Sequence, residues 1–170
     1  MKEHDSRILF SGRNTLPHTA RPIIVAASLR TPENLGNIIR LAANVGCEQV
    51  IAIDAQNLSR QKIRRTACMA IDHVELIHTD EATWLTHIPS DYEIVAVETT
   101  SASENLYTAR LNPLTAFVVG NEIHGIGDNI LRRCNRTVHI PMTGPATSMN
   151  VSHATAVVLF EWLRRMTTAL

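Results

Sequence analysis

The stretch from Ile140 to Glu161 reads I-P-M-T-G-P-A-T-S-M-N-V-S-H-A-T-A-V-V-L-F-E and joins three local patterns. It begins with the end of a short apolar strand, continues through a loop of Pro, Gly, Ser and Thr over 141–149, and enters an apolar helix near Asn150. One stripe of that helix holds Val151, Ala154, Val158 and Trp162. The Ser-x-Asn before the helix is either an ordinary N-cap or a cradle for a small polar ligand, because unpaired backbone N–H groups converge there.

Upstream of this stretch, short apolar runs alternate with helical patterns. Strands are predicted over 22–27, 49–53, 74–77, 92–97, 115–119 and 137–140. Helices are predicted over 35–45, 60–67, 80–85 and 128–134. Each strand-helix-strand unit favours a parallel pair with a right-handed crossover, so the fold class is α/β with a mainly parallel sheet and helices on both faces.

The length and composition describe an ordinary globular chain. Its 170 residues suit one domain over 22–170, preceded by a polar arm over 1–21. Apolar residues make up 45% and charged residues 19%. The formal net charge is zero, so the chain as a whole has no excess positive charge that would indicate nucleic-acid binding. A local basic patch stays possible, because net charge says nothing of distribution.

The cysteines and the N-terminus point to the cytoplasm. Cys47, Cys68 and Cys134 form no Cys-x-x-Cys pair, which argues against a zinc ribbon or a disulfide framework. Charged residues occupy the place where a signal peptide needs an apolar run, and no apolar stretch reaches transmembrane length. The sequence predicts a cytoplasmic protein without a metal and without a membrane partner.

Two segments carry clustered cations. The arm holds Lys2, Arg7, Arg13 and Arg21, and the predicted helix after Ser59 holds Arg60, Lys62, Arg64 and Arg65. Each is either a solvated surface or a grip on phosphates, which supply most nucleic-acid affinity.

Residues 120–127 form a glycine-rich loop, G-N-E-I-H-G-I-G, directly after a predicted strand. No Gly-Lys-Ser/Thr follows, so it is not a Walker loop, and the spacing is not that of a dinucleotide loop. Glu122 places a carboxylate at a strand end among backbone N–H groups. A second small polar loop, E-T-T-S-A-S-E-N over 98–105, also follows a strand, where open α/β sheets bind ligands.

Three motifs together resemble the SpoU/TrmH group of SPOUT RNA methyltransferases. They are Asn34-x-Gly36-x-x-x-Arg40, Gly120-Asn121-Glu122-x-x-Gly125, and Ile140-Pro141-Met142-x-Gly144 with Ser148-Met149-Asn150-Val151-Ser152. They occur in the family's order, and the resemblance covers 23–161. It implies a deep trefoil knot near the C-terminus, although general topology rules disfavour knots.

The resemblance also implies the activity. The family binds S-adenosylmethionine in a bent form inside the knot loops and methylates a ribose 2′-oxygen of tRNA or rRNA. It works as a homodimer whose site takes residues from both subunits.

The motifs assign candidate residues by this resemblance. The catalytic set is Arg40, Asn34, Glu122, Ser148 and Asn150, and the cofactor set is Thr99, Gly120, Asn121, Ile140, Met142, Gly144 and Met149. Arg40 is the proposed activator of the 2′-hydroxyl, either as a base or as a fork-shaped donor, since a guanidinium almost never deprotonates. Candidate RNA contacts are Arg60, Lys62, Arg64, Arg65, Arg13 and His124.

Some positions depart from the family pattern. Ile123 and His124 stand where a small residue and Arg are common, and Met149 replaces Leu in Ser-Leu-Asn. The main alternative function is a catalytically weak protein that binds S-adenosylmethionine and RNA with the same fold. A generic Rossmann-like enzyme is a third reading, but it predicts a glycine-rich loop after the first strand, where this chain has S-L-R-T-P-E-N.

Overall fold

Seven short strands form one parallel sheet in the computed structural model, which describes residue 16 and residues 19–168. The strands are β1 (Ile23–Ala27), β2 (Gln49–Ile53), β3 (Glu75–Thr79), β4 (Glu93–Val97), β5 (Glu104–Asn105), β6 (Thr115–Val119) and β7 (Arg136–His139). Their spatial order is β3-β2-β1-β6-β4-β7-β5, and every paired neighbour runs parallel. The predicted α/β class is confirmed, with β1 and β6 at the centre.

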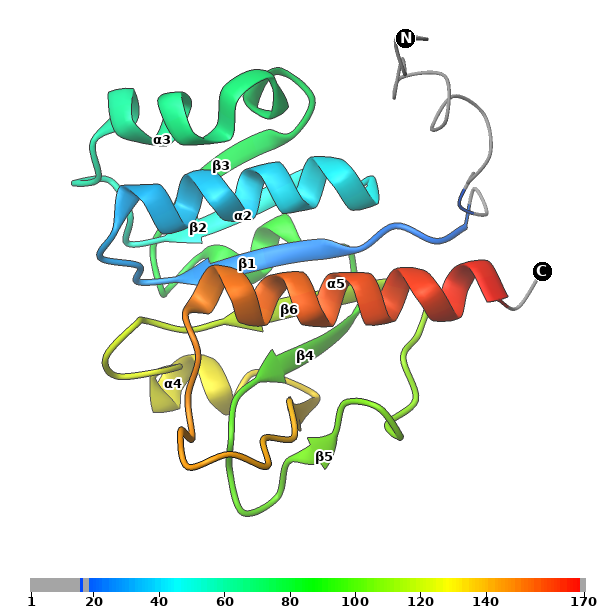
Figure 1. Cartoon of the computed structure of the whole chain (residues 1–170). Coiled ribbons are helices and arrows are strands. Elements are labelled where there is room, and N and C mark those ends of the chain that lie inside the picture. Colours follow the sequence, from blue (N-terminus) through cyan, green and yellow to red (C-terminus); the bar gives the residue numbers. More distant parts are fainter. Residues whose placement is uncertain (1–15, 17–18, 169–170) are drawn as a thin grey trace, which may run out of the picture.

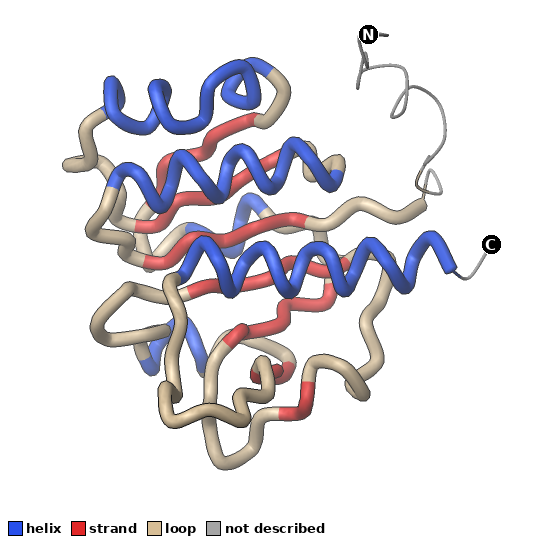
Figure 2. Tube along the Cα trace, viewed as in Figure 1, coloured by secondary structure: helices blue, strands red, loops and turns tan. Residues whose placement is uncertain are grey.

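Helices cover both faces of this sheet. They are α2 (Pro32–Val45), α3 (Arg60–Ala67), α4 (Asp128–Leu131) and α5 (Val151–Thr168), with 3₁₀ turns η1 (Cys68–Asp72) and η2 (Trp84–His87). Figure 1 shows α2, α3 and α5 side by side over one face, while α4 lies on the other side of the strands. Figure 2 shows that the loop segments gather around β4, β5 and α4.

The period-two alternation of the strands divides the core between the two faces. Ile24 and Ala26 of β1 pack with α2 and α5, whereas Ile23 and Val25 pack with Trp84 and the α4 segment. All five residues of β1 and all five of β6 are buried, as parallel strands covered on both faces must be. The continuous apolar runs of the sequence follow from this double burial.

Gly36 allows α2 to pack unusually closely on α3. A Cβ at this position would lie 2.7 Å from the Cβ of Thr66 and 2.8 Å from the carbonyl oxygen of Ile63. The glycine of the first motif therefore serves helix packing within the chain, because only a residue without a side chain fits there.

The last turns of α5 fasten the segment between β5 and β6. Trp162 is fully buried and donates from Nε1 to the carbonyl of Asn112 at 2.8 Å. Arg165 donates from Nη2 to the carbonyl of Leu106 at 2.7 Å and pairs with Glu161. These contacts satisfy backbone acceptors of a segment that has no strand partner of its own.

Element boundaries differ from the predictions in several places. The helix predicted from Leu35 begins at Pro32, because proline is well suited to the first helical position. The helix predicted over 128–134 ends at Leu131 and continues as tight turns. The helix predicted after Asp80 is a turn capped by the Asp80 carboxylate and followed by η2. The two-residue strand β5 has no signal in the sequence.

Three expectations are not settled by this architecture. Most of the predicted arm, including Arg13, lies outside the described residues. The domain boundary at residue 21 stays a prediction, and so does the trefoil knot.

Arg21, at the end of the arm, forms an ion pair with Glu48 and donates its backbone N–H to the carbonyl of Pro113.

Replacement of Gly36 by alanine is predicted to lower the free energy of unfolding by about 1 to 3 kcal/mol, the usual cost of overpacking. The added methyl group would meet backbone and Cβ atoms of α3, which cannot rotate away. Urea denaturation followed by circular dichroism measures the change. Gly144→Ala is the matched control, since no atom lies within 4 Å of its added Cβ and it caps no helix. Equal stability of the two variants would contradict the packing role of Gly36.

Candidate functional site

A cavity of about 550 Å³ opens at the carboxyl ends of β4, β6 and β7, beside the first turn of α5. Its walls are three strand-end segments and the loop that precedes α5. The lining residues are Val97, Glu98, Thr99, Val119, Gly120, Asn121, Glu122, Ile123, Gly125, His139, Ile140, Met142, Thr147, Ser148, Met149, Asn150, Val151 and Ala154. The cavity therefore lies where parallel α/β sheets bind their ligands.

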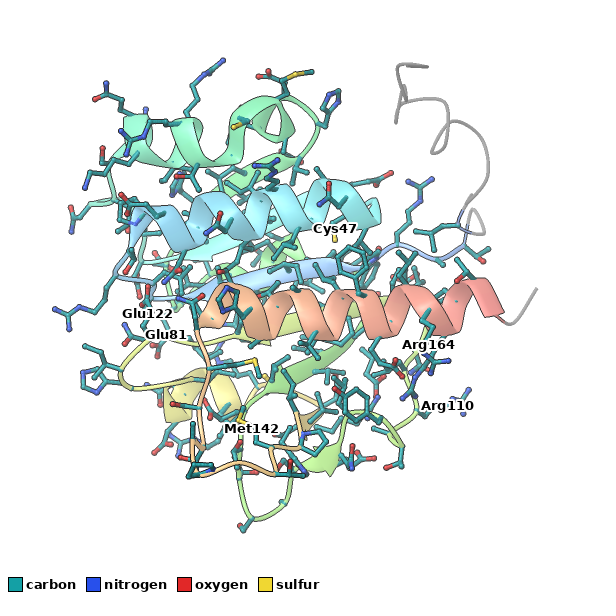
Figure 3. All side chains as sticks on the ribbon, viewed as in Figure 1. Cys47, Glu81, Arg110, Glu122, Met142 and Arg164 are labelled. Carbon is teal, nitrogen blue, oxygen red and sulfur yellow. The ribbon has the colours of Figure 1, made fainter. Side chains whose placement is uncertain are left out.

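Most of the predicted site residues lie on this cavity. Of the cofactor set, Thr99, Gly120, Asn121, Ile140, Met142 and Met149 line it, as do Glu122, Ser148 and Asn150 of the catalytic set. Figure 3 shows Glu122 near the start of α5 and Met142 on the loop before it. Gly144 does not line the cavity and has no atom within 4 Å of where its Cβ would be.

A chain of hydrogen bonds joins the three motifs. The Glu122 carboxylate accepts from the backbone N–H of Arg30 at 3.0 Å and of Thr31 at 3.1 Å, and from Asn34 Nδ2 at 2.8 Å. Asn34 Oδ1 in turn accepts from Asn150 Nδ2 at 3.1 Å. One carboxylate and two amides thus connect the β6 loop, the start of α2 and the start of α5.

The same contacts set the ionisation of Glu122. Partial burial by itself would raise its pKa, but the hydrogen bonds from Arg30, Asn34 and Thr31 outweigh burial and lower the pKa below its usual value. Glu122 is therefore a carboxylate at neutral pH that already accepts from three protein donors. It is suited to hold the loops in place rather than to accept a proton.

Asn150 also caps the helix that it precedes. Its Oδ1 accepts from the backbone N–H of Ser152 at 2.8 Å and from the Ser152 hydroxyl at 2.7 Å. The open choice between an N-cap and a ligand cradle is resolved in part, because Asn150 caps α5 and lines the cavity at once.

Asn121 and Gly125 shape the glycine-rich loop. The Asn121 side chain donates to the carbonyl of Ser28 at 2.6 Å and accepts from the backbone N–H groups of Ile123 and His124. Gly125 has a φ of +66°, and a Cβ on Gly120 would lie 2.3 Å from the carbonyl carbon of Gly125. The loop folds back on its own start, which only glycines at both positions permit.

Arg40 does not lie on the cavity. Asn34 and Arg40 both lie within α2 and are six residues apart, which is about 9 Å along the helix axis. Its side chain is exposed. The predicted start of this helix at Leu35 is wrong, and the start at Pro32 places Arg40 more than two turns into α2, away from the residues that line the cavity.

The cationic residues of α3 are exposed on the face of the molecule that carries α2. Lys62 pairs with Glu33 at 3.5 Å and Arg64 with Asp72 at 3.7 Å, and both contacts are solvent-exposed ion pairs of small energetic weight. Arg60 and Arg65 are exposed as well. His124 is exposed at the tip of the glycine-rich loop, next to Ile123 with 65% of its surface accessible.

Glu98, His139 and Thr147 also line the cavity, although none of them is among the candidate site residues assigned from the sequence. Glu98 directly follows β4 and His139 is the last residue of β7, so their place at a carboxyl strand end was the available signal. Among the described residues that line the cavity, none is Lys or Arg.

Residue 16 and residues 19–168 contain no group of three or more His, Cys, Asp or Glu side chains arranged to hold a metal ion. None of the helices over these residues combines the length and hydropathy that crossing a bilayer requires.

The chain is similar in sequence to curated RNA methyltransferases. The 23S rRNA (guanosine-2′-O-)-methyltransferase RlmB of Haemophilus ducreyi is 32% identical over 154 residues, which cover 88% of this chain and 63% of the relative. RlmB of Haemophilus influenzae is 33% identical and covers 84% of this chain and 59% of its own length. The chain thus spans about three fifths of the length of these curated relatives.

Solved structures share the fold over most of the chain. A structure described as giving insights into the 2-OH methylation of C/U34 on tRNA has a TM-score of 0.78 and 29% identity, and the match covers 88% of this chain and 99% of that one. The A. aeolicus TrmH/SpoU tRNA modifying enzyme also has a TM-score of 0.78 over 88% of this chain and 77% of its own, at 24% identity, a likeness that concerns the fold alone.

The match to a family model extends over the whole sheet. Residues 21–160 match the model of the SpoU rRNA Methylase family, from just before β1 to the middle of α5. The matched range contains all three motifs and the cavity that they surround. This chain is therefore a member of the SpoU rRNA methylase family.

Proposed function

We propose that this protein transfers a methyl group from S-adenosylmethionine to a ribose 2′-hydroxyl of tRNA or rRNA. The observation that carries the proposal is the chain of hydrogen bonds from Glu122 through Asn34 to Asn150 at the rim of the cavity. It joins three motifs that are far apart in the sequence around one hollow. The name of one relative gives 23S rRNA as its substrate and the description of a solved structure gives tRNA, and both support RNA as the substrate of this protein.

The cavity suits S-adenosylmethionine in size and chemistry. Its volume of about 550 Å³ falls in the range of small-molecule sites. Its walls offer apolar side chains, glycines and backbone groups, which can enclose an adenine without charged side chains. The lining carries the carboxylates of Glu98 and Glu122 and no described Lys or Arg, which suits a positively charged ligand. When bound, this cofactor supplies an electrophilic methyl group, and the transfer needs no metal.

The protein's own residues divide the remaining work. Glu122 and Asn34 hold the loops, Ser148 and Asn150 shape the wall beside the α5 terminus, and Gly120 lets the turn at Gly125 come close. In this proposal Arg40 orients the attacking hydroxyl and its neighbouring phosphate, since a guanidinium is a fork-shaped donor and a poor base.

The position of Arg40 supports a homodimer. Arg40 lies outside the cavity of its own chain and is exposed on α2. A second copy that places its α2 against the mouth of the cavity would complete the site with the missing cation. The proposed enzyme is therefore a homodimer with Arg40 acting on the cavity of its partner. The proposal also includes a trefoil knot and a cytoplasmic location.

The reaction itself can be tested directly. Tritiated S-adenosylmethionine is incubated with the protein and with tRNA or rRNA from a strain that lacks it, and the products are digested for nucleoside mass spectrometry. A 2′-O-methyl nucleoside in one RNA pool is expected. Cofactor binding by calorimetry without transfer to either pool would favour the alternative, a binding protein of the same fold.

Mixing two inactive variants tests the role of Arg40. Arg40→Ala and Asn150→Ala are each expected to lose at least about tenfold in methyl transfer, as removal of a positioned group at a reacting centre does. After co-refolding, half of the dimers are mixed and each holds one intact site, so about a quarter of wild-type activity is predicted to return. Cofactor affinity of Arg40→Ala should stay near wild type. No recovery in the mixture would show that Arg40 does not act across the dimer.

The α3 surface is predicted to hold RNA phosphates. The double variant Arg60→Glu/Arg65→Glu should weaken RNA binding and reduce the slope of log Kobs against log salt by about 0.7 to 0.9 per lost phosphate contact. Filter binding at several salt concentrations gives the slope. Arg110→Glu, an exposed cation beyond β5, is the control. An unchanged slope in the double variant would remove α3 from the interface.

Glu122 gives a prediction about pH. Because its pKa is lowered in the folded protein, its contribution to stability is complete above its ordinary value of 4.5 and is lost as the pH falls through the folded-state value. Glu122→Gln should therefore be less stable than wild type at pH 7, and the two should converge in acid. Denaturation at pH 7, 5 and 3.5 measures this, with the exposed Glu75→Gln as control. A stability difference that does not change with pH would contradict it.

A further inference from the structure

We infer that Glu98 is a specificity residue whose carboxylate makes the cavity favour a cationic methyl donor over the neutral product. The inference rests on the proposed function, because it assumes that S-adenosylmethionine enters the cavity. It concerns a residue outside the three motifs, at the carboxyl end of β4.

Two backbone groups fix the Glu98 carboxylate at the cavity wall. Its Oε1 accepts from the N–H of Thr99 at 3.0 Å and its Oε2 from the N–H of Ile126 at 3.0 Å. The side chain is half-buried and lines the cavity. A carboxylate held by both oxygens keeps one position, so its charge acts on the cavity from a constant place.

The glycine-rich loop is built around this carboxylate. A Cβ on Gly125 would lie 2.3 Å from Glu98 Oε2, and Gly125 has a φ of +66°. The turn therefore wraps around the Glu98 carboxylate with backbone alone. Close approach of two strand-end loops to one charged group indicates that the charge has a fixed place in the site.

The two cavity carboxylates differ in how their charge is compensated. Glu122 accepts from three donors, one of which is the side-chain amide of Asn34. Glu98 accepts two backbone N–H bonds, one on each oxygen, so each oxygen keeps a further lone pair. Glu98 directly precedes Thr99, one of the residues assigned to the cofactor, and Glu122 directly follows Asn121, another, but Glu122 is tied to the start of α2. Of the two cavity carboxylates, Glu98 therefore has fewer protein donors and more capacity left for a cationic ligand.

The charges of donor and product explain why this matters. S-adenosylmethionine carries a sulfonium, an ammonium and a carboxylate, a net charge of plus one. Transfer moves the methyl group to the ribose oxygen, whose proton leaves, and the bond from methyl carbon to sulfur breaks with its electron pair kept by sulfur. The product is then a neutral thioether with a net charge of zero. A fixed carboxylate in a partly closed cavity attracts the first and is indifferent to the second.

Calorimetric titration of the full chain tests the inference with three ligands. They are S-adenosylmethionine, S-adenosylhomocysteine, and sinefungin, which carries an ammonium-bearing carbon in place of the sulfonium. Glu98→Gln is expected to raise the Kd of both cationic ligands about tenfold and to change the Kd of S-adenosylhomocysteine by less than about twofold, as Coulomb attraction at short range requires. Asp91→Asn, at the opposite end of β4, removes the same charge away from the cavity and should leave all three unchanged.

The outcomes separate this inference from the proposed function. Equal weakening of all three ligands by Glu98→Gln would make Glu98 a structural anchor of the Gly125 turn and overturn the inference, while the proposed function stands. No binding of any of them to the wild type would overturn both. If the variant does not fold, the wild type decides, because S-adenosylhomocysteine binding as tightly as the two cationic ligands contradicts the inference.

Discussion

The carboxylate of Glu122 is the constraint on which the site depends. It accepts two consecutive backbone N–H groups at the entrance to α2 and an amide from Asn34, and through that amide it reaches the start of α5. A charged acceptor with several fixed donors is worth roughly twice a neutral hydrogen bond, so this connection is among the stronger polar links in the chain. Without it, the β1, β6 and β7 loops would have no common partner at the mouth of the cavity.

The sheet makes this meeting of loops possible. Because all seven strands run parallel, their carboxyl ends point to one edge, and every loop that follows a strand begins there. The central pair β1 and β6 is fully buried and therefore fixes the separation of the first and second motifs. Two glycines then allow close backbone contacts. Gly36 lets α2 pack closely on α3, and Gly120 lets the glycine-rich loop fold back at Gly125.

Sequence patterns predicted the regular parts well, and the resemblance located most of the cavity. The apolar runs of β1, β2 and β6 and the N-cap at Ser59 are local signals, so they were readable from neighbouring residues alone. The predicted helix start at Leu35 was three residues too late, because α2 begins at Pro32. Arg40 therefore lies farther from the start of the helix than predicted. Strand β5 could not be foreseen, because it depends on a partner distant in the sequence. The loop that begins with Glu98 was readable as a ligand-binding position, but the contact of Glu98 with Ile126 was not, because the two residues are far apart in the sequence.

The long sequence separations inside the site have a consequence for synthesis of the protein. Glu122 lies 92 residues from Arg30, and Asn150 lies 116 residues from Asn34. Contacts of such separation form late, after the local elements and the sheet are in place. A ribosome must therefore deliver the chain as far as the first turn of α5 before the cavity has all of its walls. Nascent chains that end before Asn150 lack one wall of the cavity and the last member of the hydrogen-bond chain that starts at Glu122.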